Sequence, residues 1–146
     1  MRIRPMTIED YDKVYALWLS VKGMGLNDRD DSREGIERFL NRNPLSCFVA
    51  EKDQEIIGVI LAGHDGRRGS IHHLAVREDM RRKGIAAGLV ACALSALEEQ
   101  GIRKAGILVF KDNEDGNGFW ESKGFTTRED LNYRNKVLSE LLRADT

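Results

Sequence analysis

The sequence has few of the residues that cross-link a chain or anchor it in a membrane. Its two cysteines, Cys47 and Cys92, match no zinc or redox spacing, which predicts reduced thiols in a cytoplasmic protein. The most apolar stretch, 85–97, is too short to span a bilayer, so no membrane association is expected. A formal net charge of −1 lacks the basic excess of a dedicated nucleic-acid binder. The 146 residues are therefore expected to form a single domain, 1–146.

Hydrophobic periodicity and turn residues give the expected order of elements. Strands are predicted over 2–5, 47–51, 56–62, 70–76, 105–110, 125–127 and 131–137. Helices are predicted over 7–21, 31–43, 85–100 and 116–122, the second opened by a capping box of Asp31 and Glu34. The strand–helix–strand order over 70–110 requires a right-handed crossover between parallel strands. We therefore expect a mixed α/β fold, with a mostly antiparallel sheet flanked by helices and one parallel strand pair.

The segment from Leu74 to Leu89 is the strongest functional signal in the chain. An apolar strand ends at Val76, and three basic residues then lead into a helix start that contains Gly84. Unpaired backbone amides, the positive end of a helix dipole and several cations therefore meet at one point. That combination predicts a site for a phosphorylated cofactor.

Two familiar nucleotide motifs do not account for this segment. The dinucleotide fingerprint Gly-x-Gly-x-x-Gly is absent, because Gly84 and Gly88 are spaced by four. The P-loop pattern Gly-x-x-x-x-Gly-Lys-Ser/Thr is also absent.

The motif Arg81-x-x-Gly84-x-Ala86, after a strand ending in 74–76, resembles the signature of the Gcn5-related N-acetyltransferase (GNAT) superfamily. A second segment, 119–125, resembles the aromatic pair, Glu and Gly-Phe of the same superfamily. The resemblance covers essentially the whole chain, which overall is similar to small bacterial acetyltransferases of undefined substrate. It implies an acetyl-CoA N-acyltransferase fold, with no metal.

The resemblance also implies where acetyl-CoA lies. The cofactor is expected in a cleft where the strand at 70–76 splays from the strand at 105–110, with its pantetheine arm paired to the first of these strands. Amides at the helix start would hold the pyrophosphate. The implied cofactor-binding residues are Leu74, Ala75, Val76, Arg81, Arg82, Lys83, Gly84, Ile85, Ala86, Ala87 and Asn113. The alternative for the basic triplet is a solvated cluster of cations on the surface. The alternative for Asn113 is a cap of the helix that follows it.

Acyl transfer needs a base for the amine and a donor for the developing oxyanion. The resemblance implies the backbone of Leu74 as the donor and His72 as the general base, since a superfamily member has a catalytic histidine at the position of His72. Regular alternation would place Ser70, His72 and Leu74 on one face of the strand and His73 on the other. Water as the base, and a histidine packed in the sheet, are the alternatives.

Two positions depart from the superfamily pattern. Trp120 stands where many relatives have a tyrosine that protonates the leaving thiolate, and Leu108 stands where some have a glutamate base. Neither role can be carried over, which motivates an alternative function as a non-catalytic sensor of CoA or acyl-CoA. The expected function is direct transfer of an acetyl group to a primary amine in a ternary complex.

The acceptor is expected near the first two helices. Asp28, Asp30 and Asp31 form an acidic cluster that could attract a cationic amine, although a solvated loop is the simpler interpretation. The candidate apolar wall comprises Trp18, Met24, Leu26 and Phe39. Exposed strand edges after 131 would allow a homodimer.

Overall fold

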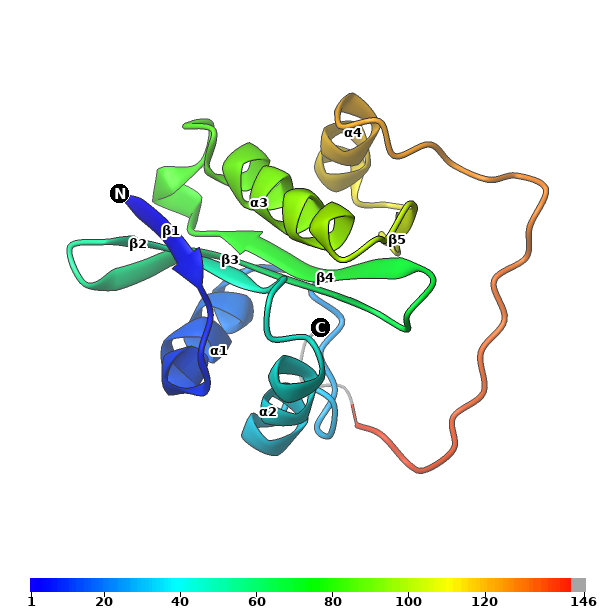
Figure 1. Cartoon of the computed structure of the whole chain (residues 1–146), viewed down its shortest axis with the longest axis horizontal. Helices are drawn as coiled ribbons and strands as arrows, with labels where there is room; N and C mark the ends of the chain where they lie inside the picture. Colours follow the sequence, from blue (N-terminus) through cyan, green and yellow to red (C-terminus); the bar gives the residue numbers. More distant parts are fainter. Residues whose placement is uncertain (143–146) are drawn as a thin grey trace.

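The computed structural model describes residues 1–142 and contains a five-stranded sheet with helices on both faces (Figure 1). The strands lie in sequence order across the sheet: β1 (Arg2–Pro5), β2 (Phe48–Lys52), β3 (Glu55–His64), β4 (Gly69–Val76) and β5 (Ala105–Ile107). Neighbours from β1 to β4 are antiparallel, and β4 pairs with β5 in parallel. The predicted mixed sheet is thus confirmed. The prediction of one domain over 1–146 extends past the described residues and stays a prediction.

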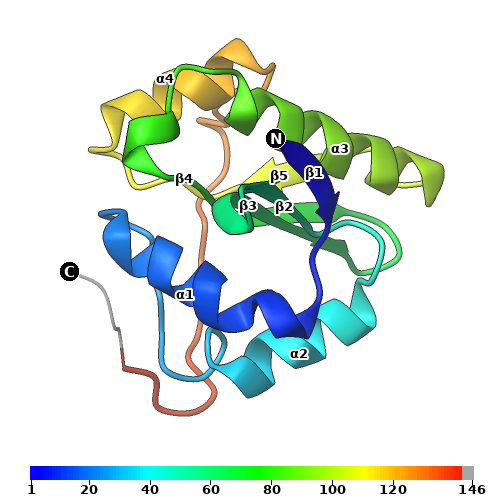
Figure 2. The ribbon, with the colours of Figure 1, turned by 90° about the vertical axis from the view of Figure 1, so that its left-hand side faces the viewer.

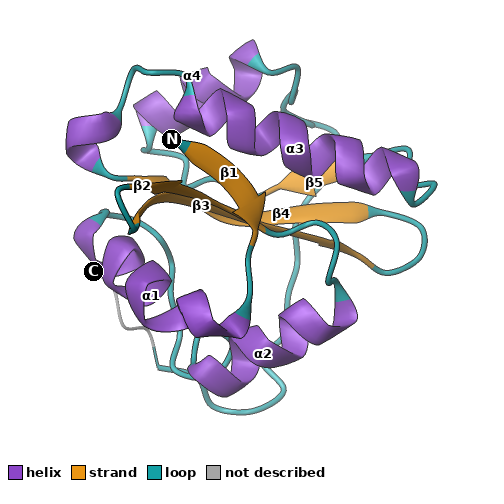
Figure 3. Cartoon of the chain, turned by 60° about the vertical axis from the view of Figure 1, so that its left-hand side comes forward, coloured by secondary structure: helices purple, strands orange, loops and turns teal. Residues whose placement is uncertain are grey.

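The helices form two layers around the sheet (Figure 3). They are α1 (Tyr11–Ser20), α2 (Arg33–Arg42), α3 (Ile85–Glu99) and α4 (Glu114–Ser122), with 3-10 turns at Ile8–Asp10 (η1) and Glu78–Met80 (η2). α1 and α2 cover one face, where Trp18 and Val59 belong to a buried cluster. α3 and α4 cover the other face, where a second cluster includes Leu89 and Trp120. The predicted helix 7–21 is interrupted, because η1 precedes α1.

The expected capping box at Asp31 is wrong, and the cap of α2 is the next residue. The Ser32 hydroxyl accepts a hydrogen bond from the Gly35 amide at 3.0 Å. The Asp31 carboxylate instead accepts from the Asn27 amide at 2.8 Å and lies against a histidine of β4. A carboxylate engaged in this way cannot also cap the helix.

A partly buried ion pair joins Asp10, which precedes α1, to Arg4 of β1. Arg4 donates to both carboxylate oxygens of Asp10, at 2.9 Å and 2.8 Å, and the Thr7 amide donates to the same carboxylate at 2.9 Å. Burial alone would raise the pKa of Asp10, but the hydrogen bonds from Arg4 and Thr7 hold that pKa below its ordinary value. The ionised carboxylate is therefore the form that the fold stabilises.

We expect Asp10→Asn to lower the free energy of unfolding at pH 7 by about 2 kcal/mol, since Arg4 loses its two-bond charged partner and keeps only Glu51, at 3.1 Å. A pKa lowered on folding gives stability that is present above the unfolded-state pKa of about 3.9 and is lost as pH falls through the folded-state pKa. Urea unfolding should therefore show the difference between the two proteins shrinking as the solution is acidified. Asp12→Asn is the control, because the Asp12 side chain is 89% exposed. A difference that is independent of pH would contradict this explanation.

Beyond α4 the structure departs from the prediction. The expected strands at 125–127 and 131–137 do not form, and the described chain from 126 to 142 runs in an extended path to the loop between α1 and α2 (Figures 1 and 2). There Asp28 and Leu142 exchange two hydrogen bonds of 2.8 Å. Strands need a partner edge, and β5 is only three residues long. Homodimerisation through this segment stays a prediction.

Candidate functional site

The sheet opens between its last two strands. β4 and β5 pair only over Gly69–Ile71 and Ala105–Ile107. The rest of β4, from His72 to Val76, continues without a neighbour on that side among the described residues, and β5 ends at Ile107 instead of the expected 110. The expected separation of the two strands is therefore present as an open edge of β4, which we call the β4 gap.

The backbone of β4 presents hydrogen-bonding groups to the β4 gap. The Arg77 amide donates to the Ile57 carbonyl on β3 at 2.8 Å. Because the antiparallel ladder alternates, the amide of Val76 faces the opposite edge, toward the gap. The Val76 carbonyl faces the same way and accepts from Arg81 Nε at 3.3 Å. This edge can pair with an extended ligand as an added strand would.

A β-bulge in β4 changes which side chains share a face. His72 pairs with Leu61 and Ala75 with Val59, so His73 and Leu74 together stand opposite Ile60. Leu74 packs toward the cluster under α3, whereas the rings of both histidines contact residues of α1 or α2. The expected common face of His72 and Leu74 is therefore wrong, because regular alternation ends at the bulge.

His72 is exposed to solvent on the side of the sheet that α2 covers, with Phe39 of α2 beside its ring. Its ring stands perpendicular to the Phe39 ring, with centroids 5.7 Å apart, and lies 6.4 Å from the ring of His73. Burial and the neighbouring His73 lower the pKa of His72 below its ordinary value, against the opposing effect of Asp31 and Asp30. The ring is consequently neutral near pH 7 and can accept a proton.

The start of α3 provides unpaired amides beside the same gap. The first hydrogen bond of the helix joins the Gly88 amide to the Gly84 carbonyl at 3.0 Å. The amides of Ile85, Ala86 and Ala87 therefore have no acceptor within the helix. No acidic side chain lies in the first turn of α3. The predicted anion site thus has the required geometry and charge.

The basic triplet and Gly84 form the loop that leads into this helix. Arg81, Arg82 and Lys83 are exposed, and Arg82 and Gly84 have positive φ angles of 62° and 80°. A Cβ built on Gly84 would meet no atom within 4 Å, so the space above it is open. Glycine is needed there for the backbone conformation, and its bareness leaves room for a ligand. Gly88 instead packs toward β1, where a Cβ would lie 3.0 Å from Ile3.

The second motif of the sequence lies on α4. Asn113 caps this helix by accepting from the Gly116 amide at 2.9 Å, as the alternative to cofactor contact predicts. Trp120 is 6% exposed and packs between the rings of Phe119 and Phe125. Leu108 follows β5 and is 70% exposed. Neither the tryptophan nor the leucine can exchange a proton.

The acidic loop between α1 and α2 is structured by its own carboxylates. Asp30 accepts from the Asn27 side chain at 2.9 Å, Asp28 bonds Leu142, and Asp31 is buried. Of the expected apolar wall, Trp18 and Leu26 are core residues, while Met24 and Phe39 are partly buried. Phe39 is the member of that set that contacts a candidate catalytic side chain.

A contact between the buried Asp31 and His73 was not predicted from the sequence. The His73 Nε2 donates to Asp31 Oδ1 at 2.7 Å, although the two residues are 42 positions apart. The only local signal is a pair of adjacent histidines in a strand, which does not reveal a bulge.

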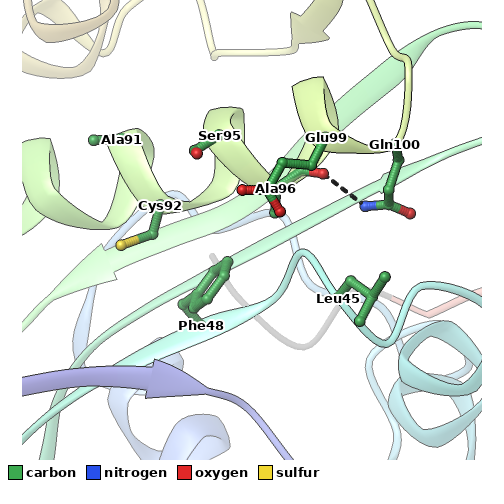
Figure 4. A pocket seen from close by; sticks show the side chains of 8 residues that line it. All are labelled: Leu45, Phe48, Ala91, Cys92, Ser95, Ala96, Glu99 and Gln100. Atoms are coloured by element: carbon green, nitrogen blue, oxygen red, sulfur yellow. Dashed lines mark hydrogen bonds between the residues drawn. The ribbon is translucent and has the colours of Figure 1, made fainter.

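A separate hollow of about 610 Å³ lies on the far side of α3, next to β2 (Figure 4). It is lined by Leu45, Phe48, Ala91, Cys92, Ser95, Ala96, Glu99 and Gln100. No cation and no helix N-terminus lies in this set, so it lacks the groups that a phosphate needs. Among residues 1–142 no cluster of His, Cys, Asp or Glu suited to a metal ion is found, and no helix there is long and apolar enough to cross a membrane.

An open strand edge beside a helix start with bare amides and cations is the arrangement that suits an extended, phosphate-bearing ligand. Residues 11–125 match the model of the acetyltransferase (GNAT) family. An acetyltransferase of Pectobacterium atrosepticum is 31% identical over 140 residues, which cover 96% of this chain and 98% of that protein. An acetyltransferase of Yersinia pestis is 33% identical over 131 residues, covering 90% and 92%.

Solved structures share the fold. Ard1 from Thermoplasma volcanium superposes with a TM-score of 0.76 at 23% identity, covering 86% of this chain and 82% of that one. The PaiA N-acetyltransferase from Thermoplasma acidophilum, solved with coenzyme A, gives 0.74 at 20% identity, covering 87% and 90%. The chain belongs to the acetyltransferase (GNAT) family, and the enzyme class is that of an N-acetyltransferase.

Proposed function

We propose that this enzyme transfers the acetyl group of acetyl-CoA to a primary amine of a small molecule, a peptide or a protein, by direct attack in a ternary complex. The observation that carries the proposal is that the open edge of β4 lies next to the unpaired amides at the start of α3. The open edge of β4 begins where the pairing with β5 ends, and it leads directly to the bare amides at the start of α3.

The residues at this place fit an acyl-CoA. The amides of 85–87 and the cations of 81–83 would hold the pyrophosphate, and Gly84 leaves the space above the loop open. The amides of Leu74 and Val76 would pair with the pantetheine arm along the β4 gap. Asn113 caps α4 through its side-chain oxygen, which leaves its amide nitrogen as the group for a cofactor contact. The coenzyme A complex of the PaiA N-acetyltransferase supports the cofactor class.

The chemistry requires a neutral amine at the thioester. Acetyl-CoA supplies the thioester carbonyl; a bond forms between the amine nitrogen and the acetyl carbon while the carbon–sulfur bond breaks. The backbone amide of Leu74 would stabilise the negative charge that develops on the carbonyl oxygen. His72, kept neutral by its surroundings, would accept the proton that the amine loses.

The departing thiolate has no side-chain acid in this proposal. Trp120 replaces the tyrosine of many relatives, and its indole is buried among aromatic rings. The thiolate of a thiol with a pKa near ~8.5 is a moderately good leaving group, so water can protonate it. We therefore propose that the solvent completes the step.

The test is release of free thiol from acetyl-CoA in the presence of a panel of amines. Spermidine, lysine, glucosamine and a peptide with a free α-amino group sample the main acceptor classes. We expect thiol release with at least one of them, accompanied by an acetylated product in the mass spectrum. Tight binding of CoA without turnover on any amine would favour the alternative function, a sensor of acyl-CoA. That alternative is motivated by Trp120 and Leu108, which replace the tyrosine and the glutamate found in relatives.

A further inference from the structure

Two unusual features coincide beside the β4 gap. His73 has a φ of 50°, a left-handed conformation that a non-glycine residue adopts at a cost in free energy. Its ring lies against Asp31, which is 3% exposed and comes from the loop between α1 and α2. A strained backbone persists only where surrounding contacts hold it.

The contacts that hold His73 come from two directions. The Trp18 indole Nε1 donates to the His73 carbonyl at 3.1 Å, and the two rings meet edge to face with centroids 5.1 Å apart. On the other side the His73 Nε2 donates to Asp31 Oδ1 at 2.7 Å. The bulge is therefore fixed by α1 and by the loop together.

Asp31 is held by hydrogen bonds to both oxygens of its carboxylate and to its backbone carbonyl. Its second carboxylate oxygen accepts from the Asn27 amide at 2.8 Å, and its carbonyl accepts from the Tyr11 hydroxyl at 2.7 Å. A carboxylate buried to this degree is stable only when it is paired and hydrogen-bonded. The Asp31–His73 contact is thus a rigid link between the loop and β4.

We infer that Asp31 and His73 form a positioning pair, which locks the loop between α1 and α2 onto the β4 bulge and so fixes His72 and the Leu74 amide for the acceptor amine. Across the bulge, the His72 ring lies toward α2 and the Leu74 side chain lies toward α3. Release of the bulge would restore regular alternation and move both groups away from their present places. The inference rests on the proposed function, because it names what holds the groups assigned there.

Three variants test the pair. Asp31→Asn removes the charge at nearly constant shape, His73→Asn tolerates a positive φ but is too short to reach Asp31, and Asp30→Asn is the control in the same loop. Asp30 is exposed, and its contacts with Asn27 are local. With the panel amine that turns over fastest, kcat should fall about 10- to 100-fold in Asp31→Asn and His73→Asn, while the KM for acetyl-CoA changes less than about 2-fold. Asp30→Asn removes a charge from the same loop and leaves the link to β4 intact, so its kcat and its KM for acetyl-CoA should match those of the wild type.

The double variant and histidine NMR distinguish positioning from general destabilisation. Asp31→Asn combined with His73→Asn should be no slower than either single variant, because the pair acts as a unit. The titratable and charged groups that act on His72 are His73, Asp31 and Asp30. Loss of the Asp31 charge, which opposes the lowering, should therefore lower the pKa of His72 further, seen in the pH titration of its ring signals.

Additive losses, or equal kcat values in Asp31→Asn and Asp30→Asn, would overturn the inference while the enzyme remained active. If the wild type turned over no amine, the proposed function would fail, and the NMR titration would still decide the pair. Ring signals of His72 and His73 that are identical in wild type and Asp31→Asn would then overturn it.

Discussion

Replacing Gly84 by aspartate is expected to weaken CoA binding about 100-fold while the protein stays folded. A carboxylate at this position would lie beside the proposed pyrophosphate site, and two like charges about 5 Å apart near a protein surface repel by about 3 kcal/mol. Aspartate tolerates the left-handed backbone better than most residues, and a Cβ at Gly84 meets no atom within 4 Å. Isothermal titration calorimetry with CoA measures the change directly.

Gly66 offers a matched control for this substitution. It also has a positive φ, of 95°, and its Cβ position is also empty within 4 Å, but it lies in the turn between β3 and β4. Gly66→Asp therefore brings the same backbone strain and the same charge without the ligand. Equal CoA affinity in the two variants would place the pyrophosphate elsewhere than at the start of α3.

Replacing His72 by alanine is expected to lower the acetylation rate at pH 7 about 100-fold, the lower end of what a general base contributes. Burial and His73 lower the pKa of His72, so the wild-type ring is neutral at pH 7 and loses its base function only below its ordinary range. At pH 9 a larger fraction of the amine is already neutral and solvent bases are stronger, so the defect should be much smaller. A pH–rate profile of both proteins with the fastest panel amine measures this.

His64→Ala is the control for the loss of an imidazole. His64 is the last residue of β3, and its Nε2 lies 2.9 Å from Oε1 of Gln100, at the end of α3. It thus contacts neither Asp31 nor His73 in these hydrogen bonds. Its pH–rate profile should have the shape of the wild-type profile. A profile of unchanged shape in His72→Ala as well would remove His72 from the reaction and leave water as the base.

The cofactor side of the site could be predicted from the sequence because it is local. Strand 70–76, the basic turn and the helix start at Ile85 follow one another in the chain, and their backbone geometry is set by neighbouring residues and by Gly84. The same holds for the cap at Asn113. Contacts of this kind depend on spacing, which a sequence displays.

The acceptor side could not be predicted in the same way. The bulge in β4 depends on contacts of His73 with Trp18 and Asp31, which come from α1 and from a loop. The alternation of polar and apolar residues does not reveal such distant partners, so it wrongly predicted a common face for His72 and Leu74. The aspartates of that loop also looked like a free acidic cluster, although folding uses their carboxylates internally.

The strands expected after α4 illustrate a third limit. The segment 131–137 alternates in the manner of a strand, but a strand forms only where an edge accepts it. β5 provides three residues, and Leu138, in the described segment that follows, is 93% exposed. The local pattern thus predicted a strand, but strand formation depends on a partner edge that this segment does not have in the described structure.

The most direct measurement of the central proposal is a titration of ¹⁵N-labelled protein with CoA, followed by the backbone amide signals. We expect the largest shifts at Leu74 and Val76 on the β4 gap and at 84–87 at the start of α3. Shifts concentrated instead around Phe48 and Cys92, in the hollow beside β2, would contradict the proposed cofactor site.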